Sequence, residues 1–223
     1  MKIEDISNLI KESEWLYSAS FTEALKVSKT TISHPDYPRT FCEIKDGVCY
    51  ATAGCIQDGE PQEGNVNQCI NLVKLPPNGK FIIDGIFEYM ADVYGRVYYA
   101  NANLSGRRIE RTDPGKQNNE RAQAKGLKVT DQGGHIIAKC LGGPNEAINI
   151  IPQDEKINIS LSKLESFISS LIDLGWSISL EVKIDYSNSS SFRPTKFKYT
   201  VKGSKKGHND IHVELNIVNS NEL

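Results

Sequence analysis

Apolar and polar side chains alternate regularly in the last third of the chain. In residues 177–186 every second side chain from Ile178 to Ile184 is apolar, and the same period of two recurs in 197–201 and 211–217. Successive side chains of a strand point to opposite faces of a sheet. The pattern therefore predicts antiparallel strands with one buried face and one solvated face.

A different spacing precedes these strands. Residues 159–176 carry apolar side chains three or four positions apart, which predicts an amphipathic helix that ends at Gly175. Its apolar positions are Leu161, Leu164, Phe167, Ile168, Leu171 and Ile172. Just before it, the apolar run 149–153 predicts a short buried strand that ends at Pro152.

Patterns are weaker in the first half of the chain. Residues 81–104 predict two strands around an acidic turn near Asp92 and Gly95, and 105–128 predict a loop with a helical turn. Residues 30–80 are rich in Gly, Pro, Asn and Cys and predict loops and short strands.

Residues 5–15 predict a further short helix. A chain with a helix between separate runs of strands is typical of the α+β class, here built on an antiparallel sheet. We expect two parts. One is an N-terminal segment of residues 1–75 with a helix and cysteine-containing loops, and the other is a folded domain of residues 76–223.

Composition excludes few classes of protein. The chain has 223 residues, of which 39% are hydrophobic and 24% charged, as in ordinary soluble domains. We find no apolar run long enough to cross a membrane, and the N-terminus lacks the pattern of a secretory signal. The chain either stays in the cytosol, leaves by a route without a cleavable signal, or is a fragment of a longer protein.

Charge is unevenly distributed, although the net charge is only −2. Basic side chains outnumber acidic ones in 102–128 and occur without any acidic residue in 192–206, whereas acidic residues gather at 43–63. Such a layout fits a polyanion bound on one face, but it also fits two solvated faces without a ligand.

Four of the five cysteines lie close together: Cys42, Cys49, Cys55 and Cys69. Their spacing is unlike the paired cysteines of zinc sites, and it leaves open free thiols, disulfides and a metal knuckle. Cys140 follows His135 by five residues. We interpret it as a packed core thiol rather than a nucleophile, because nothing nearby supplies the third member of a triad.

The stretch DQGGHIIA, residues 131–138, carries the strongest chemical signal. Glycine permits backbone angles that other residues avoid, so Gly133 and Gly134 could turn the chain and aim His135. A neutral imidazole has a pKa of about 6.5 and can take a proton from water at pH 7. His135 is therefore a candidate general base, although a packing histidine is the simpler interpretation.

Asn158 lies at the predicted start of the amphipathic helix. Its amide oxygen is a hard ligand that suits Mg²⁺, an ion that keeps several waters and takes few protein ligands. Glu165, two turns along, could hold those waters or fix Asn158. A water-activating base beside one metal at a basic surface predicts phosphodiester hydrolysis. Without further support, Asn158 could equally be a helix-capping residue.

The ordered motifs DxGGH, NxxPQ, Asn158 and Glu165 resemble those of the DNA/RNA non-specific endonucleases of the ββα-metal, or His-Me finger, superfamily. The form DxGGHIIA is similar to the branch found as toxin domains in bacterial competition systems. The resemblance runs from about Asn78 to Lys206.

The resemblance implies a ββα-metal core and a role for each matching residue. His135 would be the general base and Asn158 the direct ligand of Mg²⁺, for which Mn²⁺ could substitute. Asn149 and Glu165 would be supporting polar groups of the catalytic site. Asp131, with Gly133 and Gly134, would brace the turn that carries His135. Arg107 or Arg111 would contact the scissile phosphate, and Arg193 is a further candidate for contact with nucleic acid.

Two features differ from the better-known members. They carry Asp-Arg-Gly-His, with arginine where this chain has Gly133. Their glutamate follows the asparagine by eight positions, whereas Glu165 follows Asn158 by seven. The shorter spacing rotates Glu165 by about 100° on an ideal helix. The other interpretation that stays open is a non-catalytic nucleic-acid-binding module on the same fold.

The resemblance also implies partners and a location. DNA is the expected substrate, with RNA as a second one, and no membrane partner is expected. A toxin domain of this kind would need a cognate immunity protein. It would be delivered by a specialised secretion system and act in the cytoplasm of the target cell. A cytosolic defence or housekeeping nuclease would share the same chemistry.

Overall fold

The structure is a computed structural model that describes residues 29–34, 37–54, 56–57, 60–61, 70–106, 109, 111 and 117–220. The helix predicted for residues 5–15, and Arg107, lie outside these residues. In the described part, no helix is long and apolar enough to cross a membrane.

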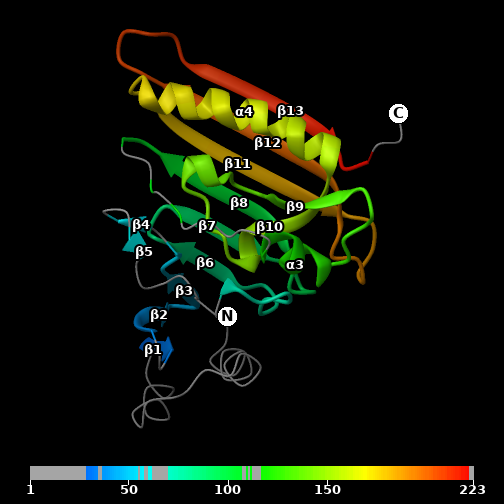
Figure 1. The fold of residues 1–223 in the computed structure, drawn as a ribbon. Coiled ribbons are helices and arrows are strands. Elements are labelled where there is room, and N and C mark those ends of the chain that lie inside the picture. The colour runs from blue at the N-terminus through cyan, green and yellow to red at the C-terminus, as the bar shows by residue number, and fades with distance from the viewer. Residues whose placement is uncertain are drawn as a thin grey trace.

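One large sheet organises the molecule (Figure 1). Within the described residues it has nine strands in the order β1-β2-β3-β6-β7-β8-β11-β12-β13, and every neighbouring pair is antiparallel except β3 and β6. The strands are β1 (Lys29–His34), β2 (Tyr37–Lys45), β3 (Val48–Ala51), β6 (Lys80–Ile83), β7 (Phe87–Ala91), β8 (Val97–Leu104), β11 (Ser177–Tyr186), β12 (Pro194–Ser204) and β13 (Ile211–Val218).

The remaining elements are short, except for one helix. Strands β9 (Asp131–His135) and β10 (Ile150–Asp154) form a separate hairpin, and β4 (Ile56–Gln57) pairs with β5 (Glu60–Pro61). The helices are α3 (Gln117–Gln123), α4 (Glu155–Asp173), and the 3-10 turns η2 (Lys139–Leu141) and η3 (Ala147–Asn149).

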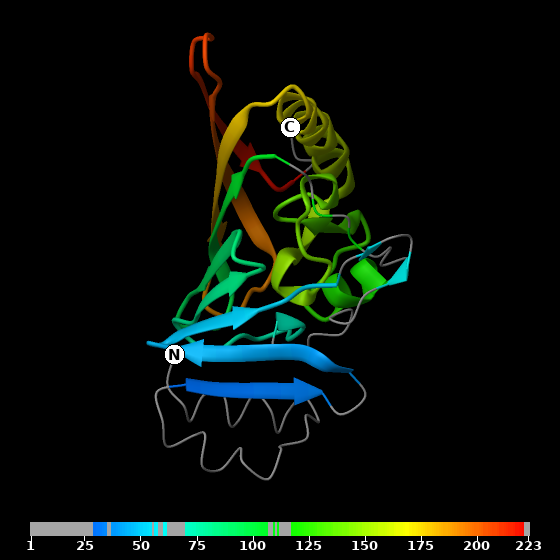
Figure 2. The ribbon, with the colours of Figure 1, turned by 90° about the vertical axis from the view of Figure 1, so that its left-hand side faces the viewer.

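The core lies between one face of the sheet and the layer that covers it. The register places Val182 of β11 between Ala100 of β8 and Tyr199 of β12, and all three side chains are buried. Helix α4 buries Leu161, Ile168 and Ile172 towards this face, and Figure 2 shows α4, the β9–β10 hairpin and α3 on the same side of the sheet. Each large apolar side chain buried there stabilises the fold by about 1.5–3 kcal/mol.

The opposite face of the sheet is polar and solvated. Ion pairs join neighbouring strands there, with Lys80 3.0 Å from Glu88 and Lys198 3.1 Å from Glu214. The α+β class and the alternating C-terminal strands predicted from the sequence are confirmed.

Two local predictions were wrong. Residues 81–104 form the larger part of three strands rather than two, because a tight turn at Asp84 and Gly85, both with positive φ, separates β6 from β7. Helix α4 begins at Glu155, four residues before the predicted start. The side chain of Asp154 accepts hydrogen bonds from the N–H groups of Lys156 and Ile157 and caps the helix there.

The N-terminal strands belong to the same sheet as the rest. Strand β3 pairs in parallel with β6, so the predicted boundary between residues 75 and 76 falls between two hydrogen-bonded strands. The division into two parts stays a prediction, but strands β1, β2 and β3 belong directly to the nine-stranded sheet.

Candidate active site

A strand hairpin followed directly by a helix carries the predicted site residues. Strands β9 and β10 pair from Asp131 with Asp154 to His135 with Ile150, and α4 begins at the next residue, Glu155. This order is the ββα arrangement that the sequence motifs predicted. His135 lies at the end of β9, and Asn158 lies in the first turn of α4.

His135 is held in one orientation by a buried asparagine. Its Nε2 lies 3.2 Å from Oδ1 of Asn145, which is only 6% exposed. An amide oxygen accepts hydrogen bonds, so this contact requires the proton on Nε2 and leaves the lone pair on Nδ1. The imidazole is thus set in the tautomer that a base needs.

Burial lowers the pKa of His135 to about 4, and the positive charges of Lys139 and Arg121 act in the same direction, against the hydrogen bond to Asn145. The ring is therefore neutral at pH 7 and can accept a proton. Lys139 and Arg121 are also the cationic side chains whose charge reaches His135.

The two glycines before His135 have a different role from the one predicted. Neither has a positive φ; both lie in the regular strand β9. A Cβ at Gly133 would overlap the backbone of Asn118 in α3, and one at Gly134 would overlap the side chain of Gln153. These positions are glycine because α3 and β10 pack directly against β9, not because the chain turns sharply.

Asp131 braces the start of β9. Its carboxylate accepts two hydrogen bonds of 2.7 Å from Arg193 and one of 2.9 Å from the N–H of Lys128. Burial opposes ionisation of Asp131, but these hydrogen bonds and the charge of Arg193 outweigh it and lower its pKa. Arg193 also donates to the carbonyl of Asn219. Its guanidinium therefore ties β9 to β12, rather than standing free for the nucleic-acid contact predicted for it.

Asn158 presents its oxygen, not its nitrogen, as the available group. Its Nδ2 donates to Oε1 of Gln132 at 2.9 Å, and Gln132 in turn donates to Glu155 at 2.9 Å. Oδ1 of Asn158 accepts no hydrogen bond within the described part of the chain. A half-buried amide oxygen, oriented from behind and open to water, fits a ligand of Mg²⁺. No three His, Cys, Asp or Glu side chains gather at a metal-binding distance among the residues described.

The sequence model of the DNA/RNA non-specific endonuclease family matches residues 77–205, which is more than half of the chain. The chain belongs to this family of DNA/RNA non-specific endonucleases. It is accordingly a nuclease that hydrolyses phosphodiester bonds, and the family is one of metal-dependent enzymes.

Two crystal structures of NucA from Streptococcus agalactiae are similar to this nuclease. The one with magnesium ion bound has 15% sequence identity and a TM-score of 0.47, and the likeness covers 60% of this chain and 72% of that chain. The one with no metal bound has 18% identity and a TM-score of 0.45, covering 60% and 70%. No curated protein matches the sequence.

Asn149 supports the site of the nuclease from behind. It is fully buried, and its Oδ1 accepts from the Tyr89 hydroxyl and from the N–H of Ile137, both at 2.9 Å. Its Nδ2 donates to the carbonyls of Ile137 and Pro144. Because both ends of the amide are used in this way, Asn149 positions the chain after His135 and does not reach the reacting atoms.

Glu165 lies two turns along α4 from Asn158. Seven residues return to nearly the same face of an ideal helix, roughly 10 Å further along its axis. Burial raises the pKa of Glu165 to about 7, and its charge acts on the buried Tyr199 of β12. Glu165 is half-buried on α4. The structure does not place it beside Asn158, and its supporting role stays a prediction.

Arg111 is not at the surface, contrary to the expectation for a phosphate contact. Its side chain is buried, its Nη2 lies 2.7 Å from Oδ2 of Asp84, and its Nε donates to the carbonyl of Gly142 at 2.7 Å. Its guanidinium also lies over the ring of Phe87. These contacts engage the guanidinium inside the protein. Cys140, predicted to be packed in the core, is exposed, whereas Cys49 is buried.

Sequence reasoning missed Asn145, Gln132 and Glu146. Asn145 and Glu146 follow Gly142-Gly143-Pro144, a turn signal that gives no hint of contact with His135. Gln132 sits inside the motif that was examined, but only the pairing of β9 with β10 and the start of α4 bring it to Asn158.

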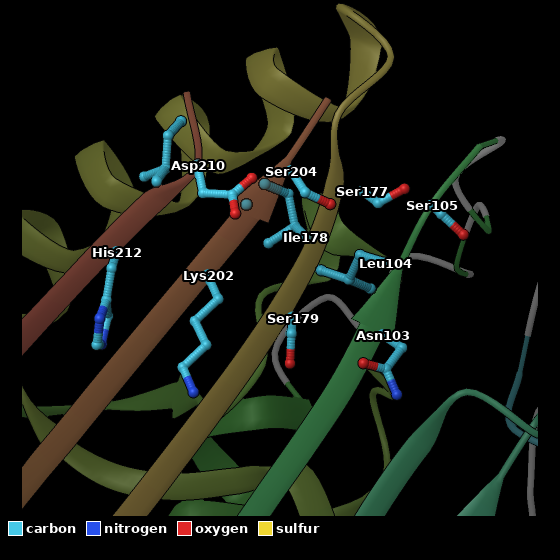
Figure 3. Close-up of a pocket in the computed structure, with 12 residues that line it drawn as sticks. Asn103, Leu104, Ser105, Ser177, Ile178, Ser179, Lys202, Ser204, Asp210 and His212 are labelled. Carbon is cyan, nitrogen blue, oxygen red and sulfur yellow. The ribbon is translucent and has the colours of Figure 1, made fainter. Parts of the chain in front are cut away.

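A groove of about 450 Å³ lies away from these residues. It crosses β8, β11, β12 and β13 on the face of the sheet opposite α4. Figure 3 shows Asn103, Ser179, Lys202 and His212 on these neighbouring strands, where the register aligns them in one row. None of the residues that carry the predicted chemistry lines this groove.

Proposed function

We propose that the chain is a Mg²⁺-dependent endonuclease that cleaves DNA, with RNA as a second substrate, with little sequence specificity. His135 is the general base and Asn158 holds a single metal ion, for which Mn²⁺ can substitute. The observation that carries this proposal is that the side chains of His135 and Asn158 are each held in one orientation. Asn145 leaves the lone pair of His135 on Nδ1, and Gln132 leaves Oδ1 of Asn158 without a hydrogen bond in the described structure.

Each of these side chains then has a distinct role in the reaction. Nδ1 of His135 takes a proton from the attacking water, while Asn145 keeps the opposite N–H in place and stabilises the imidazolium that forms. Oδ1 of Asn158 would hold the metal, and Gln132 fixes the orientation of the amide group of Asn158. When bound, Mg²⁺ supplies stabilisation of the charge that develops on the phosphate and on the leaving oxygen.

Contacts to the substrate backbone come from cationic groups near His135. Lys139 and Arg121 are the candidates, because their charges reach His135; Nε of Arg121 also donates to Asn71 at 2.9 Å. Arg107 stays a proposal from the family resemblance. Arg111 and Arg193 instead act through the carboxylates with which they pair.

A plasmid-nicking assay tests the proposal. Supercoiled DNA is incubated with the full chain in Mg²⁺, and a parallel sample contains EDTA; an RNA substrate is run beside it. We expect nicking that EDTA abolishes. His135→Ala should lower the rate by roughly 100- to 10,000-fold, while DNA binding in a gel-shift assay is retained. His212→Ala is the matched control, because His212 is an exposed histidine on β13 far from the site.

Other outcomes discriminate the alternatives. Binding without cleavage by the intact chain, at any metal concentration, would overturn the nuclease mechanism and favour the non-catalytic binding module. Cleavage that survives in His135→Ala would assign the base elsewhere.

We further propose that this nuclease is an antibacterial toxin domain that is delivered into target cells and neutralised by a cognate immunity protein. The support is the DxGGHIIA pattern at residues 131–138. Induced expression inside a bacterial cell should be toxic for the active chain and harmless for His135→Ala. Survival of cells that express the active enzyme would instead favour a cytosolic defence or housekeeping role.

A further inference from the structure

Segments upstream of the family-matched residues contact the loop that follows His135. We call residues 142–147 the catalytic loop, because Asn145 lies in it. The N–H of Gly54 donates to Oε1 of Glu146 at 2.9 Å, and Oδ1 of Asn71 accepts from the N–H of Ala147 at 2.9 Å. Gly54 and Asn71 both precede residue 77, where the family match begins.

Arg111 joins the same segments to the start of the catalytic loop. It donates to the carbonyl of Gly142 at 2.7 Å and to that of Gly54 at 3.4 Å, and it pairs with Asp84. Asp84 in turn accepts from the N–H of Ala53 at 3.1 Å. Residues 53–54 are therefore attached at both ends of the catalytic loop, through Arg111 at one end and Glu146 at the other.

Glu146 is only 2% exposed, so its carboxyl group depends on hydrogen-bond partners within the protein. Burial raises its pKa to about 7, partly offset by the hydrogen bond from Gly54 and by the charge of Arg111; the charge of Asp84 raises it further. Its charge also acts on Arg121 of α3 and on Tyr89 of β7. A buried carboxyl group that loses its hydrogen-bond donor is costly, so Gly54 and the catalytic loop keep one relative position.

We propose that residues 53–54 and Asn71 are positioning residues of the nuclease, which latch the catalytic loop so that Asn145 holds His135 in its base tautomer. The functional unit then extends upstream of the family-matched residues. This inference rests on the proposed role of His135 as general base. It assigns a task to part of the segment 1–75, for which the sequence predicted only loops, short strands and a helix.

Paired substitutions at two independent attachments test the latch in the full chain. Asn71→Ala removes the acceptor for the N–H of Ala147 and for Nε of Arg121, whereas Asn71→Asp keeps an oxygen at the same place. Glu146→Ala removes the acceptor for Gly54, whereas Glu146→Gln keeps it. Glu181→Gln, on the polar outer face of the sheet, is the matched control. The readouts are kcat and KM on plasmid DNA, the thermal midpoint, and the pKa of His135 from NMR of the four histidines.

We expect both alanine variants to lose roughly 10- to 100-fold in kcat with little change in KM, because small displacements of catalytic groups have effects of that size. The pKa of His135 should rise from about 4 towards 6.5 as the ring becomes better solvated. Asn71→Asp and Glu146→Gln should restore most of kcat. A purely structural role would lower the thermal midpoint and leave the pKa of His135 unchanged.

Two failures are distinguishable. If the unmodified chain does not cleave DNA, the proposed nuclease mechanism fails. If it cleaves, and both alanine variants fold, cleave at the same rate and keep the low pKa of His135, the latch is overturned while the nuclease stands.

Discussion

The two halves of the active site are built differently. On one side, His135 contacts the buried Asn145, and the chain around it is fixed by Asn149 and Glu146, which are 0% and 2% exposed. On the other side, Asn158 is half-buried in the first turn of α4, and its side chain has one hydrogen-bond partner among the described residues, Gln132. His135 and Asn158 are both half-buried, but the side chains that fix the base are buried, whereas the metal ligand lies beside water. We call the first the buried half of the site and the second the open half.

The difference follows from what each group must do. A base needs one tautomer and a neutral ring, and burial with a fixed amide partner supplies both. A Mg²⁺ ligand has to leave room for the waters that this ion keeps, so it needs an orienting partner and little else. Damage to the buried half should therefore appear in kcat and in stability, and damage to the open half should appear in the dependence on metal.

Asn158→Ala should have the largest effect on the open half. Loss of a partner behind a metal ligand typically costs 10- to 100-fold, so removal of the ligand itself should cost at least about 100-fold in activity at fixed Mg²⁺. Asn158→Asp keeps an oxygen ligand and should retain more activity. A Mg²⁺ titration of plasmid nicking measures both. Equal Mg²⁺ dependence in Asn158→Ala and the unmodified chain would remove Asn158 from the metal site.

Gln132→Ala should have a smaller effect of the same kind. It removes the acceptor that holds Nδ2 of Asn158, and we expect the Mg²⁺ concentration for half-maximal activity to rise by roughly 10-fold. The activity at saturating Mg²⁺ should change little, because the ligand oxygen is still present. A fall in the rate at saturating Mg²⁺, without a shift in Mg²⁺ dependence, would instead show that Gln132 supports His135 rather than the metal ligand.

Gly133→Ala tests the buried half through stability. The added Cβ would overlap the backbone of Asn118, which cannot move aside without shifting α3. Overpacking of this kind costs about 1–3 kcal/mol in the free energy of unfolding. Gly134→Ala should cost less, because its Cβ meets a side chain, that of the buried Gln153, rather than a backbone. Thermal unfolding of both variants measures the difference, and a larger loss in Gly134→Ala would contradict this account of β9.

These glycines show how far the sequence could be interpreted. The motif identified the right strand and the right histidine, because the pattern and order of its residues are visible in the sequence itself. Its physical interpretation was wrong, because a glycine needed for close packing and a glycine needed for a turn look the same in a sequence. Only the position of Asn118, contributed by α3, distinguishes them.

The arginines show a second limit. A cluster of basic residues predicted a surface that binds phosphate, yet Arg111 and Arg193 neutralise Asp84 and Asp131. Those acids lie 27 and 62 positions away along the chain. No local sequence pattern predicts an ion pair between residues so far apart in the chain. The same is true of the contact of Gly54 with Glu146. Strands and helix were predictable because their periods are local, whereas these partners depend on the completed sheet.

The smallest predicted effect concerns pH. An ordinary histidine, with a pKa of about 6.5, would lose most of its neutral form between pH 7 and pH 5.5. His135 has a pKa lowered to about 4, so its neutral form persists there, and kcat/KM should fall by less than about twofold on its account. The folded state binds this proton less readily than the unfolded chain, so its stabilising contribution is complete above pH 6.5 and is lost as pH falls towards 4.

Glu146 and Glu165, each with a pKa raised to about 7, titrate in the same window. The profile is therefore measured in Glu146→Gln and Glu165→Gln as well. A tenfold fall by pH 5.5 that persists in both variants would mean that the surroundings of His135 do not lower its pKa, and the contrast between the buried half and the open half of the site would not hold.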